Sequence, residues 1–320
     1  MRAAVHTRYG PPDVVGVREV PTPTAGAGEL LVRVHATTVN RTDCAARTAK
    51  PAFMRLVTGL TAPRRTILGN EFAGEVESVG SGVTAFRPGE RVFGYVEGPF
   101  GAHAEYLTVP ATGSLATIPP ELSFEQAAPA TEGAHYALAM IRKTRVRAGQ
   151  DVLVHGATGA IGSAAVQLLA SVGARVTAVC ATAHLELVAG LGADRVIDYT
   201  ITDFTRDRRR YDVVVDAVGK SSFGRCRPLL KPRGTYLSSE LGPRGENPFL
   251  ALATPLLGGR RVAFPIPRHD QAMIAYLRDL LASGELRPLV DRSYPLDRIV
   301  EAYRYVETGQ KIGNVVVAVG

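Results

Sequence analysis

Hydrophobic and polar positions change their period abruptly at Gly156. Residues 152–154 form a continuous apolar run of strand length, and glycines follow it. Beyond the glycines, apolar side chains recur at helical spacing, at Ile161, Ala165 and Leu168, which places them on one face of a helix. The pattern therefore predicts a buried strand, a glycine-rich turn and a helix.

Strands and helices continue to alternate after this unit. We expect further strands at residues 175–180, 195–198, 211–217 and 234–238, with a helix at 184–191. Elements of this length and order predict an α/β fold with a doubly wound parallel sheet. The amino terminus of a helix above such a turn suits a pyrophosphate. The alternative is a glycine turn in an α/β domain that holds no nucleotide.

The chain before residue 123 has a different texture, with short β-type runs separated by glycine and proline. This pattern predicts an all-β-like domain, in which residues 42–60 are the most helical stretch. A helix at 124–141 is expected to join it to the α/β region. The remaining expected elements are helices at 270–282 and 297–306 and a last strand at 313–319.

Composition describes an ordinary globular protein of 320 residues, with 46% hydrophobic and 21% charged residues. The three cysteines are widely spaced, so we expect neither a disulfide framework nor a C-x-x-C metal site. The first residues lack the apolar core of a signal peptide, and no apolar run reaches membrane-spanning length. We therefore expect a cytoplasmic protein without a membrane partner.

The net charge of +7 raises the question of a nucleic-acid partner. The basic residues are scattered, except for the run at 206–210, and no nucleic-acid-binding motif accompanies them. We interpret that run as a solvated loop and expect no nucleic-acid partner.

Five motifs carry a family resemblance. They are Val39-Asn40-Arg41-Thr42-Asp43, the G-N-E-F-A-G-E-V segment at 69–76, R-P-G-E-R-V at 87–92, G-A-H-A-E-Y at 101–106 and V-I-D-Y at 196–199. With the glycine turn, they make the chain similar to the medium-chain dehydrogenase/reductase superfamily. Within it, the chain resembles the zinc-free quinone oxidoreductase (zeta-crystallin-like) branch.

The resemblance implies three parts. Residues 1–123 would form a GroES-like catalytic domain, residues 124–285 a Rossmann domain that binds NADP(H), and residues 286–320 a return to the catalytic domain. It also implies a homodimer formed through the nucleotide domain near residues 261–265.

Metal ligands are replaced at two matching positions. Zinc-dependent members of the superfamily have a cysteine at the start of C-x-x-D and a histidine in G-H-E, where this chain has Asn40 and Asn70. Amides bind zinc poorly compared with thiolate and imidazole. We therefore expect no metal site.

The cofactor prediction depends on the end of the strand at 175–180. An acidic side chain there would bind the ribose of NAD and repel the extra phosphate of NADP, but no acid occurs before Glu186. This favours NADP(H), and the resemblance places Thr182, His184 and Tyr199 at the 2′-phosphate. The other expected cofactor contacts are Gly156, Ala157, Thr158, Gly159, Ala160, Ile161, Gly162, Val218, Ser238, Phe264, Gly313 and Asn314.

The candidate catalytic residues indicate a reaction that needs hydrogen-bond donors but no strong general acid. No Tyr-x-x-x-Lys acid occurs, so reduction of a C=C conjugated to a carbonyl is favoured over reduction of a carbonyl. We assign Asn40 as an amide donor and Asp43 as an orienting carboxylate, and His135 as a ribose contact or proton donor. Each has a structural alternative: a turn residue for Asn40, a helix cap for Asp43 and a packed histidine for His135.

The sequence thus predicts an NADPH-dependent reductase of enones, enals or quinones that works without zinc on a small-molecule substrate. Two alternatives stay open. One is a reductase dedicated to an enoyl or polyketide-type biosynthetic intermediate, and the other is a non-catalytic NADPH-binding redox sensor.

Overall fold

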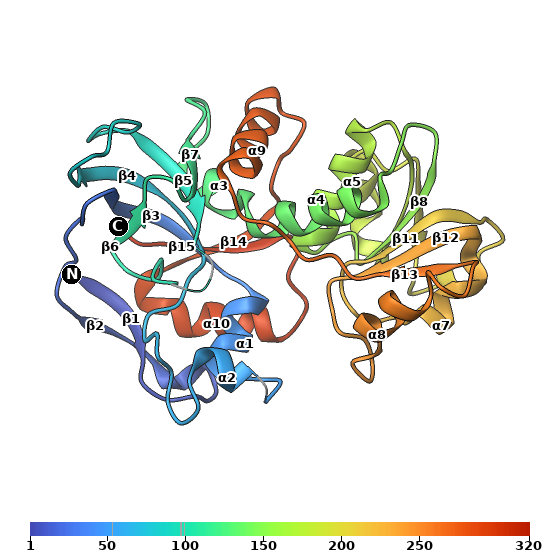
Figure 1. Cartoon of the computed structure of the whole chain (residues 1–320), viewed down its shortest axis with the longest axis horizontal. Helices are drawn as coiled ribbons and strands as arrows, with labels where there is room; N and C mark the ends of the chain where they lie inside the picture. The colour runs from blue at the N-terminus through green and yellow to red at the C-terminus, as the bar shows by residue number, and fades with distance from the viewer. Residues whose placement is uncertain (53, 97, 99) are drawn as a thin grey trace. The chain divides into compact units, whose positions relative to one another are not determined.

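The computed structural model describes residues 1–52, 54–96, 98 and 100–320, and its chain divides into two compact units (Figure 1). The first unit contains residues 1–132, 269–283 and 288–320. The second contains residues 133–268 and 284–287. We expected domain boundaries at residues 123 and 285. The structure instead groups residues 124–132 and 269–283 with the first unit.

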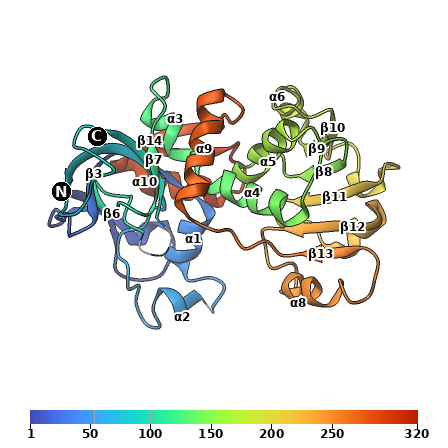
Figure 2. The same cartoon turned by 45° about the horizontal axis from the view of Figure 1, so that its top comes forward.

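The second unit is built on a parallel sheet of six strands in the order β10-β9-β8-β11-β12-β13, which confirms the predicted doubly wound fold. In both views α5 and α8 lie on opposite faces of this sheet (Figure 1 and Figure 2). The strands are β8 (Asp151–His155), β9 (Arg175–Cys180), β10 (Arg195–Asp198), β11 (Tyr211–Asp216), β12 (Leu230–Ser238) and β13 (Arg261–Ala263). The helices of four or more residues are α4 (Glu132–Thr144), α5 (Ala160–Ser171), α6 (Leu185–Gly190), α7 (Phe223–Cys226) and α8 (Glu246–Ala253).

Burial explains why the central strands are continuous apolar runs. Val152, Leu153 and Val154 of β8 are all inaccessible to solvent, because helices cover both faces of a parallel sheet. The six-residue strand β9 is buried from its second residue to its last. The sheet therefore holds its carboxyl edge, where the glycine turn begins, in a fixed position.

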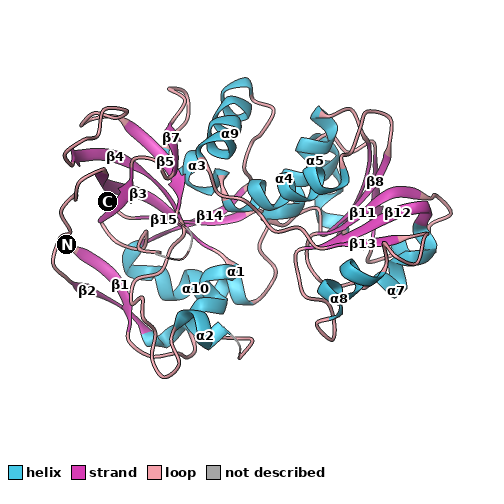
Figure 3. Cartoon of the chain, viewed as in Figure 1, coloured by secondary structure: helices cyan, strands magenta, loops and turns pink. Residues whose placement is uncertain are grey.

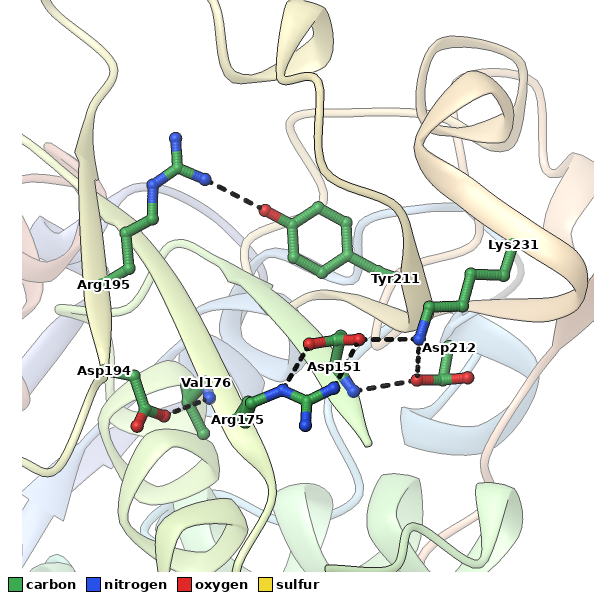
Figure 4. Close-up of polar contacts among 8 residues, drawn as sticks. All are labelled: Asp151, Arg175, Val176, Asp194, Arg195, Tyr211, Asp212 and Lys231. Atoms are coloured by element: carbon green, nitrogen blue, oxygen red, sulfur yellow. Dashed lines mark hydrogen bonds and ion pairs between the residues drawn. The ribbon is translucent and has the colours of Figure 1, made fainter. Parts of the chain in front are cut away.

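An ion-pair network ties the amino-terminal ends of the strands together (Figure 4). Lys231 Nζ lies 2.6 Å from Asp151 Oδ2 and 2.7 Å from Asp212 Oδ2. Arg175 donates two hydrogen bonds to Asp151, at 2.8 and 2.9 Å. These contacts with Arg175 and Lys231 hold the pKa of Asp151 at about 2. The network lies at the edge of the sheet opposite to the glycine turn.

The first unit is a largely antiparallel sheet in the order β14-β15-β3-β4-β5-β7, with β6 also paired to β3. Strand β15 runs antiparallel to β3, with Val315 opposite Val39. The unit also contains a two-stranded ribbon, β1 with β2, and the helices α9 and α10. The strands are β1 (Arg2–His6), β2 (Val15–Glu19), β3 (Glu29–Val39), β4 (Glu71–Val79), β5 (Arg91–Tyr95), β6 (Tyr106–Pro110), β7 (Ser114–Thr117), β14 (Val290–Pro295) and β15 (Asn314–Ala318). The helices of this unit that follow residue 132 are α9 (Gln271–Ser283) and α10 (Ile299–Glu307).

Two expected helices are broken, so those predictions were wrong in detail. The stretch at 42–60 forms α1 (Arg41–Thr48) and α2 (Met54–Thr58) (Figure 3). Ala49 ends α1 with a left-handed φ of 49°, and Pro51 follows, which cannot donate a helical hydrogen bond. Residue 53, which we had included in this helix, lies outside the described residues.

The stretch at 124–141 divides for a similar reason. It forms α3 (Phe124–Ala127), a 3₁₀ turn at Ala128–Ala130 and then α4, because Pro129 has no N–H to continue an α-helix.

Among the described residues, no helix has the length and apolar character needed to cross a membrane.

The Lys231 network generates a stability prediction. Replacing Lys231 by Met leaves Asp151 and Asp212 without the ammonium group that they share, so we expect a loss of about 1 kcal/mol of unfolding free energy at neutral pH. The pKa of Asp151 is below its ordinary value, so this stabilisation is present above about pH 4 and is lost as the pH falls toward 2.

Urea unfolding of wild type and Lys231→Met across that pH range checks this. The exposed Lys220 provides the control, Lys220→Met. The loss of unfolding free energy should be larger for Lys231→Met than for Lys220→Met, and it should shrink in acid. An equal loss in both variants, or a loss that stays constant as the pH falls, would contradict the network's role.

Candidate functional site

The glycine turn brings strand β8, helix α5 and the loop after β11 into close contact. A Cβ added at Gly162 would lie 2.1 Å from the carbonyl oxygen of Gly156, so α5 can approach the end of β8 only with glycine at that position. Gly156 itself has a φ of 81°, and a Cβ there would meet the Val218 side chain at 2.8 Å. The turn is therefore packed tightly on its inner side.

The outer side of the turn is open. A Cβ added at Gly159 would have only the Gly156 oxygen, at 3.6 Å, within contact range. Gly159 is the N-cap of α5, and among the described residues no side chain caps this helix and no acidic residue occupies its first turn. The free N–H groups and the helix dipole therefore remain available to an anion, so this turn fits the pyrophosphate of a dinucleotide.

The start of α5 is also fixed from the side by α4. A Cβ at Gly133 would lie 2.7 Å from the carbonyl carbon and oxygen of Ala160. The beginning of α4 and the beginning of α5 are therefore in contact through backbone atoms.

The residues expected at the 2′-phosphate lie at the carboxyl ends of β9 and β10. Thr182 is exposed, His184 half-buried and Tyr199 55% exposed, so each is accessible to a ligand. Thr182 Oγ1, however, donates to Asp198 Oδ2 at 2.6 Å. The end of β9 has no acidic residue of its own, but Asp198 at the end of β10 places a carboxylate beside it.

The other expected cofactor residues fall into two groups. In the second unit, Ser238 is buried at the end of β12 and accepts from the Glu240 N–H at 3.1 Å, while Phe264 follows β13. In the first unit, the Asn314 side chain donates to Leu289 O at 3.0 Å, and Gly313 with its φ of 73° packs against the same residue. A cofactor role for these residues stays a prediction.

Asn40 and Asp43 form a reciprocal cap at the start of α1. Asp43 N–H donates to Asn40 Oδ1 at 3.1 Å, and Asn40 N–H donates to Asp43 Oδ2 at 3.0 Å. The second oxygen of Asp43 accepts from Gly69 N–H at 2.9 Å. Burial raises the pKa of Asp43 to about 7. Its carboxyl group thus caps α1, which is the structural alternative that we gave for it. It also joins the loop after β3 to the segment before β4.

Two buried amides lie in this region with unused hydrogen-bonding atoms. Asn40 Nδ2 and both side-chain polar atoms of Asn70 have no hydrogen-bond partner among the described residues. Buried polar groups are usually paired, so these atoms are suited to a ligand. They are poor ligands for zinc, and no group of three or more His, Cys, Asp or Glu residues within the described chain could hold a metal ion. The donor set does not fit a zinc ion.

Glu71 is the anchor of the polar interior next to these amides. Its Oε1 accepts from Thr131 N–H, Thr131 Oγ1 and Glu132 N–H at 3.1, 2.7 and 2.6 Å. Its Oε2 accepts from Thr38 Oγ1 at 2.6 Å. This one side chain therefore joins β3 and β4 to the start of α4.

Glu132 and Lys311 bring two further titratable side chains to the same interior. Burial raises the pKa of Glu132, and the carboxyl group of Glu71 raises it further. Glu132 Oε1 accepts from Thr42 Oγ1 at 2.7 Å. Burial lowers the pKa of Lys311, although Glu132 and Glu71 oppose that shift. Lys311 also donates to the carbonyl of Gly313.

His103 and His135 are both buried. His103 Nε2 lies 2.8 Å from Thr38 O, which can only accept, so Nε2 carries the hydrogen and Tyr303 OH donates to Nδ1 at 3.3 Å. Burial lowers the pKa of His103 to about 4. His135 is 2% exposed in α4, with its ring 4.7 Å from that of Tyr136.

Sequence reasoning missed three charged residues of these sites, namely Asp198, Glu132 and Lys311. Asp198 was part of the V-I-D-Y motif, but we considered only its tyrosine. Glu132 and Lys311 belong to segments far apart in the chain, and no local pattern indicates that they share one interior.

Comparisons with known proteins agree with this architecture. The model of the alcohol dehydrogenase GroES-like domain matches residues 26–120, and that of the zinc-binding dehydrogenases matches residues 191–317. The 2-methylene-furan-3-one reductase of Solanum lycopersicum is 30% identical over 99% of this chain and 79% of its own length. The chloroplastic NADPH-dependent alkenal/one oxidoreductase of Arabidopsis thaliana has the same identity and coverage.

The fold is also that of a solved relative. The quinone oxidoreductase from Coxiella burnetii superposes with a TM-score of 0.89 at 27% identity, covering 100% of this chain and 99% of that one. Together with the parallel sheet and the glycine turn, these relatives define an oxidoreductase of the nicotinamide dinucleotide-binding class. The chain belongs to the medium-chain dehydrogenase/reductase superfamily, in its quinone oxidoreductase branch.

The two sides of the glycine turn predict different effects of one added methyl group: a loss of stability on the packed side and a loss of nucleotide affinity on the open side. Gly162→Ala forces a Cβ onto the Gly156 carbonyl, so we expect a loss of about 2 kcal/mol of unfolding free energy or more. Gly159→Ala has the space and an ordinary φ of −73°, so it should fold normally but bind nucleotide at least about tenfold more weakly, because the methyl occupies the anion's side of the turn.

Chemical unfolding and nucleotide titration of both variants check this. Each variant is the control for the other. Normal stability of Gly162→Ala, or unimpaired nucleotide binding by Gly159→Ala, would contradict the two-sided description of the turn.

Proposed function

We propose that the protein is an NADPH-dependent reductase of activated C=C bonds in enones, enals or quinones, and that it works without zinc. The observation that carries the proposal is the pair of buried amides, Asn40 and Asn70, with polar atoms that have no partner among the described residues. Hydrogen-bond donors are what the enolate oxygen of a conjugate reduction requires. The relatives named as alkenal/one oxidoreductase and 2-methylene-furan-3-one reductase support the same substrate class.

The bound nicotinamide nucleotide supplies the hydride, which goes to the β-carbon of the acceptor. Asn40 Nδ2 donates to the carbonyl oxygen as negative charge develops there, and the α-carbon takes its proton from water. Asp43 keeps Asn40 in place, because the reciprocal cap fixes both the backbone and the Oδ1 side of the amide. His135 contacts the ribose or supplies a proton in this proposal.

The choice of NADPH has two supports. The second strand of the Rossmann sheet ends without an acidic residue before Glu186, and the Arabidopsis relative is named as NADPH-dependent. Thr182, His184 and Tyr199 are the residues that we expect to surround the 2′-phosphate. Independence of zinc is supported by the amides Asn40 and Asn70 in place of thiolate and imidazole ligands.

The amide of Asn40 provides the sharpest test. Asn40→Ser keeps an oxygen that can cap α1 but removes the Nδ2 donor. We expect kcat with a linear enone to fall about 100-fold, with unchanged nucleotide affinity and thermal stability. Loss of NADPH absorbance follows the reaction, using a quinone, an enone, an enal and a saturated aldehyde as acceptors, each with and without a chelator.

Oxidation of NADPH by the unsaturated acceptors alone, unaffected by chelator, is the expected outcome for wild type. Chelator-sensitive activity on the saturated aldehyde would overturn the proposal. Nucleotide binding without turnover on any of the acceptors would instead favour a dedicated biosynthetic substrate or the redox sensor.

We further propose that the protein forms a homodimer through the edge of the Rossmann sheet. Strand β13 is the last strand of that sheet, and the adjacent helix α8 and the loop after it expose large apolar side chains. Phe249, Leu252, Leu256 and Leu257 are 74, 76, 88 and 80% exposed. An exposed apolar patch beside a free strand edge is suited to a second copy of the chain.

Leu256→Glu combined with Leu257→Glu should therefore convert a dimer to a monomer, because two charges would be desolvated at the contact. Light scattering measures the molar mass. Leu56→Glu, at a 69% exposed position in α2 of the first unit, is the control and should remain dimeric. A monomeric wild type would contradict the proposal.

A further inference from the structure

Asp198 lies where the nucleotide-binding edge of the sheet meets the predicted 2′-phosphate residues. It is the last residue of β10 and pairs in register with Cys180, the last residue of β9. Both strands run parallel to β8, so their carboxyl ends share the edge at which the glycine turn begins. The order of the strands reverses at β8, and dinucleotides bind at such an edge near the reversal.

The carboxylate of Asp198 is held by two threonines. Thr182 Oγ1 donates to Oδ2 at 2.6 Å, and Thr200 Oγ1 donates to Oδ1 at 2.6 Å. Thr200 N–H adds a third hydrogen bond to Oδ1 at 2.8 Å. Hydrogen bonds to the ionised form are stronger than those between neutral groups. The Thr182 and Thr200 hydroxyls accordingly hold the pKa of Asp198 below its ordinary value.

A hydroxyl group has one hydrogen, and this limits what Thr182 can offer. Its hydrogen is directed to Asp198, and that of Thr200 is directed to the same carboxylate. The two hydroxyl oxygens lie 2.8 Å apart. The cluster of Thr182, Asp198 and Thr200 therefore presents lone pairs and one negative charge to a ligand.

Such a surface suits a ligand that donates hydrogen bonds. The 2′-hydroxyl of NAD(H) is a donor, whereas the 2′-phosphate of NADP(H) is a dianionic acceptor that needs donors and positive charge. An acidic residue near the adenine ribose has this selective effect in Rossmann folds generally. Here the acid comes from the third strand rather than the second.

We propose that Asp198 is the specificity-determining residue for the cofactor: it withholds the Thr182 hydroxyl from the 2′-phosphate and opposes its charge, so the protein accepts NADH as well as NADPH. This inference rests on the proposed function only in taking the site to bind a nicotinamide nucleotide. It deepens that proposal by naming the residue that limits the preference for NADPH.

The test is Asp198→Asn, with nucleotide binding measured by calorimetry in the absence of any acceptor substrate. Removing one negative charge near the phosphate should tighten NADPH binding about tenfold or more, while NADH binding stays equal or weakens. As a single substitution, Thr182→Ala should change NADPH affinity little. Added to Asp198→Asn, it should cancel part of the gain in NADPH affinity, because only in that background is the Thr182 hydroxyl free to donate to the phosphate.

Asp203 offers a matched control. Its Oδ1 accepts from Thr205 N–H at 3.0 Å and from Thr205 Oγ1 at 2.7 Å, which repeats the local arrangement of Asp198 with Thr200. Asp203 caps the 3₁₀ turn that begins at Phe204. Asp203→Asn removes the same charge from a similar turn, and the ratio of NADPH to NADH affinity should stay at the wild-type value.

The outcomes separate this inference from the proposed function. An unchanged affinity ratio in Asp198→Asn, or an equal shift in Asp203→Asn, would overturn the role of Asp198 while leaving the reductase proposal standing. Failure of the wild type to bind either nucleotide would overturn both. If Asp198→Asn misfolds, the single variant Thr182→Ala is the test instead. A large loss of NADPH affinity in that variant would show that the Thr182 hydroxyl already binds the phosphate, which would overturn the role of Asp198.

Discussion

The contact between α5 and the end of β8 is the constraint on which the second unit depends. Gly162 allows the helix to lie directly on the Gly156 carbonyl, where any side chain would collide with backbone at 2.1 Å. That approach points the free N–H groups of α5 at the open side of Gly159. The buried strands β8 and β9 keep the turn in place, and the polar ends of neighbouring strands gather around it.

The first unit depends on a buried carboxyl group in a comparable way. Glu71 accepts four hydrogen bonds from Thr38, Thr131 and Glu132. Burial raises the pKa of Glu71, and those bonds oppose that shift by stabilising the ionised carboxylate. Asp43 does the same on a smaller scale between α1 and Gly69. With both carboxyl groups occupied, the buried atoms without a partner among the described residues here include Asn40 Nδ2, the Asn70 amide and Glu132 Oε2.

Local patterns predicted the Rossmann sheet well and the long-range contacts poorly. The strands at 175–180 and 195–198 match β9 and β10 because short apolar runs between breakers have few other solutions. The helical stretch expected at 42–60 is broken because Pro51 lies inside it. The neighbourhood of Thr182 could not be predicted either, since the acid that holds it, Asp198, is 16 residues later and reaches it only through strand pairing.

Gly133 gives the molecule a stiff joint between two helices. Its missing side chain lets the first turn of α4 rest on the peptide unit of Ala160, leaving no compressible layer of side chains between them. A ligand that pulls the first turn of α5 by even a fraction of an ångström must therefore move the first turn of α4 with it. Within the second unit, the nucleotide turn and the start of α4 therefore behave as one rigid piece.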